Sequence, residues 1–147
     1  RRQLEHYLNE CRERCAANLK PVGIILIDVD HFKFYNDRYG HQRGDELLQT
    51  LATILMGRLR RSEDMLARYG GEEFLAVLPG ADIGTLLDVA EDMRKAVEQS
   101  PLGVRISAGA AARLITSDQE LHDLIGEADR RLYLAKHNGR NQTVIDG

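Results

Sequence analysis

Hydrophobic and polar positions near the start of the chain follow two different periods. Apolar side chains recur every three to four residues before Pro21, which predicts an amphipathic helix: Leu4, Leu8, Cys11 and Cys15. Residues 22–27 are continuously apolar and rich in β-branched side chains, which predicts a strand buried on both faces. Two carboxylates, Asp28 and Asp30, follow this strand directly. Acids at the end of a buried strand are unusual, so they need a chemical or structural reason.

The middle of the chain predicts a helix followed by a β-hairpin. Residues 44–59 carry apolar side chains at helical spacing. Two β-like runs, residues 65–68 and 74–78, then flank the pair Gly70-Gly71. Paired glycines between two such runs are a strong hairpin signal, and two glutamates follow them at the expected tip.

The last part of the chain predicts two more helices, each followed by a strand. Asp82 can cap the first helix, and the small residues of 104–112 then form a strand. Ser117 or Asp118 can cap the second helix, which ends at Asn138-Gly139 before a final strand at residues 142–145. This order predicts one α+β domain, a mixed α/β sandwich with a central mixed β-sheet flanked by helices.

Composition limits the class of protein. Of the 147 residues, 43% are hydrophobic and 29% are charged, which is typical of one folded globular domain. The longest purely apolar stretch is far shorter than the roughly 18 residues of a membrane span, which argues against direct membrane insertion. A net charge of -3 lacks the basic surface that DNA binding needs.

The two cysteines, Cys11 and Cys15, lie four residues apart on the first predicted helix. This spacing favours packing over a disulfide and indicates a reducing, cytoplasmic setting. A zinc site that joins them to His6 is the alternative, but no second ligand pair stands at zinc spacing.

The acids at the end of the first strand and at the hairpin tip form the candidate chemistry. Asp28, Glu72 and Glu73 can converge in space and hold hard divalent cations through oxygen. Taken singly, each acid is more often a turn residue, a helix cap or a solvated charge than a metal ligand. Several carboxylates held together repel one another unless a cation neutralises them, so their convergence predicts metal.

Three motifs in order carry a family resemblance: DVDHFKFYNDRYGHQRGD at residues 28–45, RYGGEEF at residues 68–74 and YLAKHNGRN at residues 133–141. They closely resemble the GGDEF-domain diguanylate cyclases, in the GGEEF variant of the signature. The resemblance implies a ferredoxin-like palm, the nucleotide cyclase architecture, with the GGEEF motif on a β-hairpin. It also implies that residues 1–147 are a single catalytic domain, a fragment of a longer protein whose sensory N-terminal region is absent and which could itself be membrane-tethered.

The resemblance also assigns roles around the acids. Asp28, the backbone carbonyl of Val29, Glu72 and Glu73 correspond to ligands of two Mg²⁺ or Mn²⁺ ions per active site. Glu72 matches the proton acceptor and Lys33 matches the lysine that stabilises the transition state, so the expected catalytic residues are Glu72, Lys33 and Glu73. Such ions activate the attacking hydroxyl and neutralise charge on the phosphate.

Asn36 and Asp45 have the chemistry to read guanine. A carboxylate accepts both donors of the guanine edge, and an amide both accepts and donates. The resemblance places both residues at guanine-reading positions, while the alternative for Asn36 is a helix cap.

The triphosphate needs a different kind of site, because the chain has no G-x-x-x-x-G-K-[ST] motif. Backbone amides of His31, Phe32 and Lys33 can form a phosphate nest after the strand. Lys136 and Arg140 match the family's phosphate-binding pair; alternatively, they are the basic end of a helix.

Arg61 and Asp64 form an R-x-x-D pattern shortly before the hairpin. By itself such a pair is usually a surface ion pair of little energetic value. In the family this position is an inhibitory site for the product, and an Arg fork with a nearby carboxylate suits a guanine nucleotide. His41 follows Gly40, and we expect it to pack within a loop.

The expected function is therefore that of an enzyme, a nucleotidyltransferase that condenses two GTP into cyclic di-GMP and releases pyrophosphate. Its partners would be GTP, cyclic di-GMP as product and inhibitor, and a second copy of the chain, because the product joins two nucleotides. The alternative is a catalytically silent regulatory module that binds cyclic di-GMP or GTP. A third reading, a cyclase acting on another base, depends on what Asn36 and Asp45 recognise.

Overall fold

The computed structural model describes residues 2–147; Arg1, where the expected domain begins, lies outside the described residues. The elements along the chain are α1 (Arg2–Ala17), β1 (Val22–Val29), α2 (Phe32–Tyr39), α3 (His41–Met56), β2 (Met65–Arg68), β3 (Glu73–Pro79), α4 (Ile83–Gln99), β4 (Ile106–Arg113), α5 (Asp118–His137) and β5 (Thr143–Val144). Among these described residues, no helix is both long and apolar enough to cross a bilayer.

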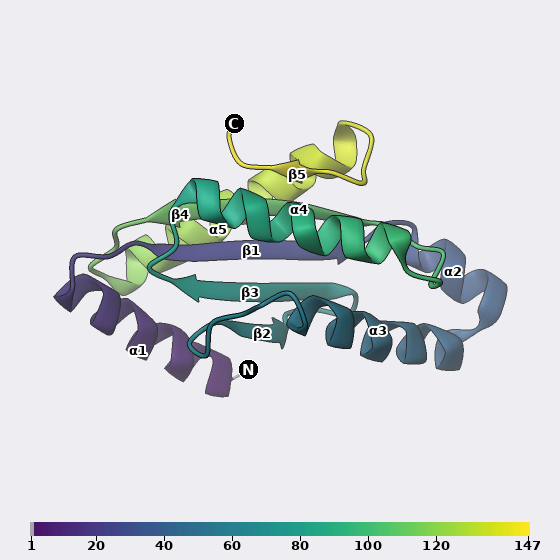
Figure 1. The fold of residues 1–147 in the computed structure, drawn as a ribbon, viewed down its shortest axis with the longest axis horizontal. Coiled ribbons are helices and arrows are strands. Elements are labelled where there is room, and N and C mark those ends of the chain that lie inside the picture. The colour runs from purple at the N-terminus through teal and green to yellow at the C-terminus, as the bar shows by residue number, and fades with distance from the viewer. Residues whose placement is uncertain (1) are drawn as a thin grey trace.

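The sheet has five strands in the order β2-β3-β1-β4-β5, with β1 at its centre (Figure 1). β1 pairs antiparallel with both β3 and β4, whereas β4 pairs parallel with β5. All eight residues of β1 are buried, as the apolar run predicts for a strand covered on both faces. The expected mixed sheet flanked by helices is confirmed.

Alternation along β1 divides the core into two layers. Ile24 and Leu26 pack with the inner faces of α1 and α5, whereas Ile25 and Ile27 pack with α3 and α4. Figure 1 shows α4 crossing the sheet on one side and α5 on the other. The side chain of Asp28 therefore belongs to the α5 face, because it continues the even-numbered series.

Gly109 in β4 allows α5 to approach the sheet closely. A Cβ atom built at this glycine would overlap the Ala128 carbonyl oxygen and the Leu132 amide nitrogen of the helix. The backbone contact fixes the height of α5 above the strands, and with it the place of every side chain on that helix.

The caps of the two long helices match the sequence prediction. Asp82 accepts a hydrogen bond from the Thr85 amide at the start of α4, and Ser117 accepts one from the Glu120 amide at the start of α5. Asn138 ends α5 as expected.

The sequence analysis was wrong in the segment between β1 and α3, because it predicted no helix over residues 32–39. α2 has only eight residues and buries only Phe32, so it lacks the apolar stripe that identifies a helix. Gly40, with φ 90°, separates α2 from α3, and α3 therefore begins at residue 41 instead of 44 and ends at residue 56 instead of 59. β1 also extends two residues further than predicted, so that Asp28 is part of the strand.

Candidate active site

The acidic cluster lies where β1 and β3 end side by side. Asp28 of β1 is the direct antiparallel partner of Glu73 of β3, so both carboxylates project from the same face of the sheet. Directly opposed residues have Cβ atoms about 4.5–5.5 Å apart. Glu72 stands next to them on the hairpin, and its carbonyl accepts the Val29 amide at 3.4 Å. The strand register thus brings together the acids that the sequence analysis expected to converge.

The carboxylates of this cluster repel one another. Burial, followed by repulsion from Asp28, raises the pKa of Glu72 to about 6. Burial also raises the pKa of Asp28 and Glu73 above their ordinary values. Lys136 of α5 counters this effect, because its Nζ atom lies 2.6 Å from Asp28 Oδ2.

Asp28 retains an unused ligand atom. The residue is only 4% exposed, and its Oδ1 atom is buried without a hydrogen-bond partner. A buried carboxylate oxygen without a partner is costly, and oxygen donors of this kind suit Mg²⁺ or Mn²⁺. Within residues 2–147, no three His, Cys, Asp or Glu side chains stand together so that they could hold a metal ion, and Lys136 lies beside Asp28. The oxygen donors of Asp28, Glu72 and Glu73 are nonetheless of the type that suits a divalent ion, and such an ion would have to displace this lysine.

The hairpin that carries the glutamates is braced by its own backbone. The Tyr69 amide donates to the Glu73 carbonyl at 2.9 Å. Arg68 donates to the Gly71 carbonyl at 2.5 Å and lies over the ring of Phe74. Sequence reasoning assigned no role to Arg68, although its position beside Gly-Gly is a usable signal for such a brace.

A tight turn connects β1 to α2. His31 adopts a left-handed conformation, φ 58°, and is the residue from which α2 starts. The first amides of a helix have no intrahelical partner, so Phe32 and Lys33 present N–H groups at this turn. The side chain of Lys33 is exposed. The turn has the chemistry of the expected phosphate nest.

The two guanine-reading candidates lie on neighbouring helices, Asn36 on α2 and Asp45 on α3. Asn36 is not a helix cap, because it stands inside α2. Its Oδ1 atom is buried without a partner and lies against Gly44, where an added Cβ would overlap it. Asp45 follows Gly44 in α3 and is exposed. Gly44 is a residue that sequence reasoning missed, since no spacing rule identifies it.

The expectation for His41 was wrong: it is the first residue of α3 and its side chain is exposed, so it does not pack within a loop. The loop prediction failed because Gly40 ends one helix and starts the next without any intervening loop.

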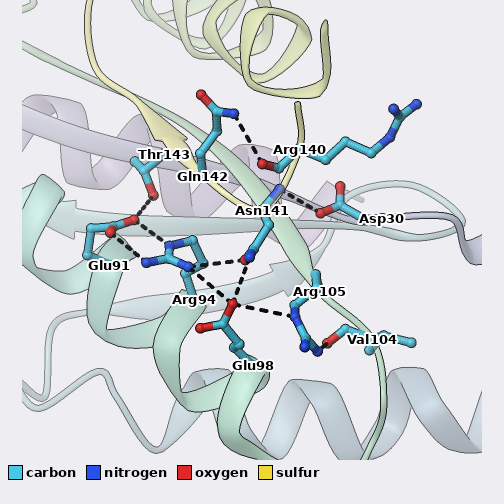
Figure 2. Close-up of polar contacts among 10 residues, drawn as sticks. All are labelled: Asp30, Glu91, Arg94, Glu98, Val104, Arg105, Arg140, Asn141, Gln142 and Thr143. Carbon is cyan, nitrogen blue, oxygen red and sulfur yellow. Dashed lines mark hydrogen bonds and ion pairs between the residues drawn. The ribbon is translucent and has the colours of Figure 1, made fainter. Parts of the chain in front are cut away.

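The phosphate candidates Lys136 and Arg140 stand at and beyond the end of α5. Lys136 lies in the last turn of the helix, and its ammonium group points to Asp28. Arg140 follows the helix in a left-handed conformation, φ 64°, and its side chain is exposed. In Figure 2 this side chain extends away from the polar network that holds the neighbouring backbone.

Arg61 and Asp64 pair with each other near the end of β3 that lies away from Glu73. Arg61 Nη2 donates to Asp64 Oδ1 at 2.8 Å and to the Pro79 carbonyl at 2.9 Å. The side chain of Asp64 is nearly buried, whereas that of Arg61 is 41% exposed. A shallow cavity of about 330 Å³ opens beside the pair, and its lining includes Arg58 and Asp92.

The prediction that the two cysteines pack in the core is confirmed. Cys11 and Cys15 are buried free thiols that pack in the α1 layer. His6 pairs with Glu10 on the exposed face of α1, at 2.8 Å, so the described residues do not support the zinc alternative.

Comparison with known proteins identifies the family. The family described as "Diguanylate cyclase, GGDEF domain" matches residues 1–142. Response regulator PleD of Caulobacter vibrioides is 37% identical over 153 residues, which cover 98% of this chain and 33% of that protein. The chain thus spans about a third of the length of this curated relative.

Two solved structures have the same fold. The active GGEEF domain of a diguanylate cyclase from Vibrio cholerae is 32% identical with a TM-score of 0.92, covering 100% of this chain and 96% of that one. The GGDEF domain of DgcB from Caulobacter crescentus in complex with c-di-GMP is 28% identical with a TM-score of 0.86, covering 99% and 89%. With the acids, the hairpin and the fold in agreement, this chain belongs to the GGDEF family of diguanylate cyclase domains.

Proposed function

We propose that this domain condenses two molecules of GTP into cyclic di-GMP and releases pyrophosphate. The observation that carries the proposal is the convergence of Asp28, Glu72 and Glu73 at the paired ends of β1 and β3. Family membership supports the same activity. The intact acidic cluster favours this reading over a catalytically silent nucleotide-binding module.

Different residues would bind the guanine base and the triphosphate of GTP. Asn36 and Asp45 would hold the guanine edge, because the buried Asn36 oxygen still lacks a partner. The amides at residues 31–33, with Lys33, Lys136 and Arg140, would bind the triphosphate. These groups stand on α2, on α3 and at the end of α5, so the fold sets the distance between base and phosphates.

Divalent ions held by Asp28, the Val29 carbonyl, Glu72 and Glu73 would neutralise phosphate charge and favour the ionised hydroxyl. We place two Mg²⁺ or Mn²⁺ ions there by family resemblance. When they bind, Lys136 would be released from Asp28 and become available to the phosphates.

In the reaction, the 3′-oxygen of one GTP attacks the α-phosphorus of the other, and the bond to the pyrophosphate oxygen breaks. Glu72 would take the hydroxyl proton, the role that the family resemblance assigns to its position. A second attack in the reverse sense closes the ring. Because one domain binds one GTP, two copies must face each other, and we propose a catalytic homodimer.

We also propose that the cavity at Arg61 and Asp64 binds the product and inhibits turnover. Support comes from the DgcB structure, which contains c-di-GMP, and from the cavity beside the pair. A ligand phosphate or guanine would have to compete with Asp64 for the Arg61 fork. Arg61→Ala should therefore raise turnover late in the reaction and leave the initial rate unchanged, with Ser62→Ala as the neighbouring control.

We also propose how the domain is controlled and where in the cell it acts. A sensory region elsewhere in a longer protein would control pairing of the domains. The buried free thiols Cys11 and Cys15 agree with a reducing, cytoplasmic setting.

The activity is tested by incubating the protein with GTP and Mg²⁺ and identifying products by mass spectrometry. We expect cyclic di-GMP and pyrophosphate from the wild-type chain and none from Glu73→Gln, which removes a charge at nearly constant shape. Glu10→Gln, on the exposed face of α1, is the matched control and should remain active. Absence of any cyclic dinucleotide from a preparation shown to be dimeric would contradict the proposal.

A further inference from the structure

Two consecutive residues after α5 adopt a conformation that needs support. Arg140 and Asn141 have φ values of 64° and 47°, in the left-handed region that non-glycine residues rarely occupy. Asparagine tolerates this region better than arginine does. The backbone at Arg140, one of the proposed phosphate ligands, is therefore held by its surroundings.

Asn141 provides this support through its backbone amide and both polar atoms of its side chain (Figure 2). Its backbone amide donates to Asp30 Oδ2 at 3.0 Å. Its side-chain Nδ2 donates to Glu98 Oε2 at 2.7 Å, and its Oδ1 accepts from Arg94 Nη1 at 3.1 Å. One residue thus joins the end of β1 to two successive turns of α4.

Arg94 is itself fixed before it reaches Asn141. Its guanidinium forms a two-pronged contact with Glu91, at 2.8 and 3.0 Å, and its side chain is only 15% exposed. Glu91 also accepts from Thr143 at 2.9 Å, on the far side of Asn141. α4 therefore holds the chain at Asn141, within the left-handed turn, and at Thr143, just after it.

Asp30 connects this clamp to the phosphate nest. It is 5% exposed, accepts the Ser107 hydroxyl at 2.6 Å through its other oxygen, and directly precedes His31. The same carboxylate thus binds the loop that carries Arg140 and anchors the turn that presents the amides of residues 31–33. The two proposed phosphate-binding segments share one buried anchor.

We propose that Asn141, held by Arg94, is a positioning residue that aims Arg140 at the nucleotide triphosphate and sets its distance from the nest after β1. This inference rests on the proposed function for the role of Arg140. The residue touches no substrate itself, and its effect passes through the backbone of the preceding arginine.

The test compares Asn141→Ala with Arg140→Ala and the double variant in the full chain. Calorimetry with Mg²⁺ present measures binding of inorganic triphosphate and of guanosine, and steady-state assays give KM and kcat for GTP. We expect Asn141→Ala to weaken triphosphate binding and raise KM about tenfold, the equivalent of one charge-assisted hydrogen bond. Guanosine binding should not change, and the double variant should bind triphosphate no more weakly than Arg140→Ala alone.

Two controls separate positioning from stability. Asn138→Ala changes an exposed asparagine at the end of the same helix and should leave both constants unchanged. Asn141→Gly keeps the left-handed conformation and the amide bond to Asp30, so it should recover part of the lost affinity. A merely structural role would lower Tm and the active fraction, and kcat would fall at constant KM.

The outcomes are distinguishable. If Arg140→Ala weakens triphosphate binding and Asn141→Ala does not, the positioning role is overturned and the proposed function stands. If Arg140→Ala has no effect, its assignment as a phosphate ligand fails, and the inference fails with it.

Discussion

Asp28 determines the electrostatics of the site because its two oxygens have different surroundings. Oδ2 is paired with Lys136, whereas Oδ1 is buried and has no partner. Glu72 and Glu73 add negative charge on the same side of the sheet. The cluster thus has the charge and the oxygen atoms to attract a cation, and this leads to a prediction for stability.

Mg²⁺ should raise the Tm of the wild-type chain, because a ligand that binds only the folded state stabilises it by mass action. The folded pKa of Glu72, about 6, exceeds its ordinary value of 4.5, so its proton is lost first from the unfolded state. Without metal, stability should therefore fall as the pH rises from 4.5 to 6. Mg²⁺ should give a larger Tm increase above this window than below it, where protons compete with the ion.

Differential scanning fluorimetry with and without Mg²⁺ measures both effects. Glu10→Gln should respond as the wild type does, while Asp28→Asn should lose most of the response. An equal Tm increase in Asp28→Asn and the wild type would place the ion elsewhere.

Gly44 makes room for the buried amide of Asn36, so its replacement should damage nucleotide recognition. Gly44→Ala places a methyl group on Asn36 Oδ1, and the side chain or helix must shift. We expect about 1–3 kcal/mol of destabilisation from this overpacking and weaker binding of GTP. Urea unfolding and GTP titration measure the two effects.

Gly126→Ala is the matched control, since open space surrounds that glycine in α5. It should keep nucleotide affinity and gain up to about 1 kcal/mol of stability from helix propensity. Unchanged GTP affinity in Gly44→Ala would show that Asn36 does not read the base.

Among the helices and strands, those with a strong local sequence pattern could be predicted, and those without one could not. α4 and α5 have long apolar stripes and side-chain caps, so the start of α4 could be predicted to the residue and that of α5 to within one residue. α2 was not predicted because it buries only one residue. It contributes to the proposed nucleotide site through its N-terminal turn and Asn36. The acids could be predicted from the sequence, but their register across β1 and β3 depends on strand pairing that local patterns do not specify.

The contact between α5 and β4 should be sensitive to a single methyl group. Gly109→Ala forces the helix backbone away from the strand, which should destabilise the protein by about 1–3 kcal/mol or more. Because α5 also carries Lys136, the shift should reduce turnover in the fraction that remains folded. Chemical denaturation with parallel activity assays checks this, and full activity at unchanged stability would contradict the backbone contact.

At the scale of the whole molecule, a net charge of -3 conceals a division of charge. Acids gather at the ends of β1 and β3, and Lys136 pairs with Asp28. Lys33 follows β1 in the chain, and Arg140 directly precedes Asn141, whose amide donates to Asp30. Such a division suits a polyphosphate that arrives with divalent cations and not an extended nucleic acid. Chelation of the metal should therefore weaken GTP binding more than moderate added salt does.

In the proposed reaction, each product molecule joins two guanylyl units that come from two GTP molecules. An equal mixture of ordinary and uniformly ¹⁵N-labelled GTP, converted by the dimeric protein with Mg²⁺, tests it by mass spectrometry of the product. We expect a dominant cyclic di-GMP species of intermediate mass, with one labelled and one unlabelled half. A nucleotide product that contains only one guanylyl unit, or no product at all, would contradict it.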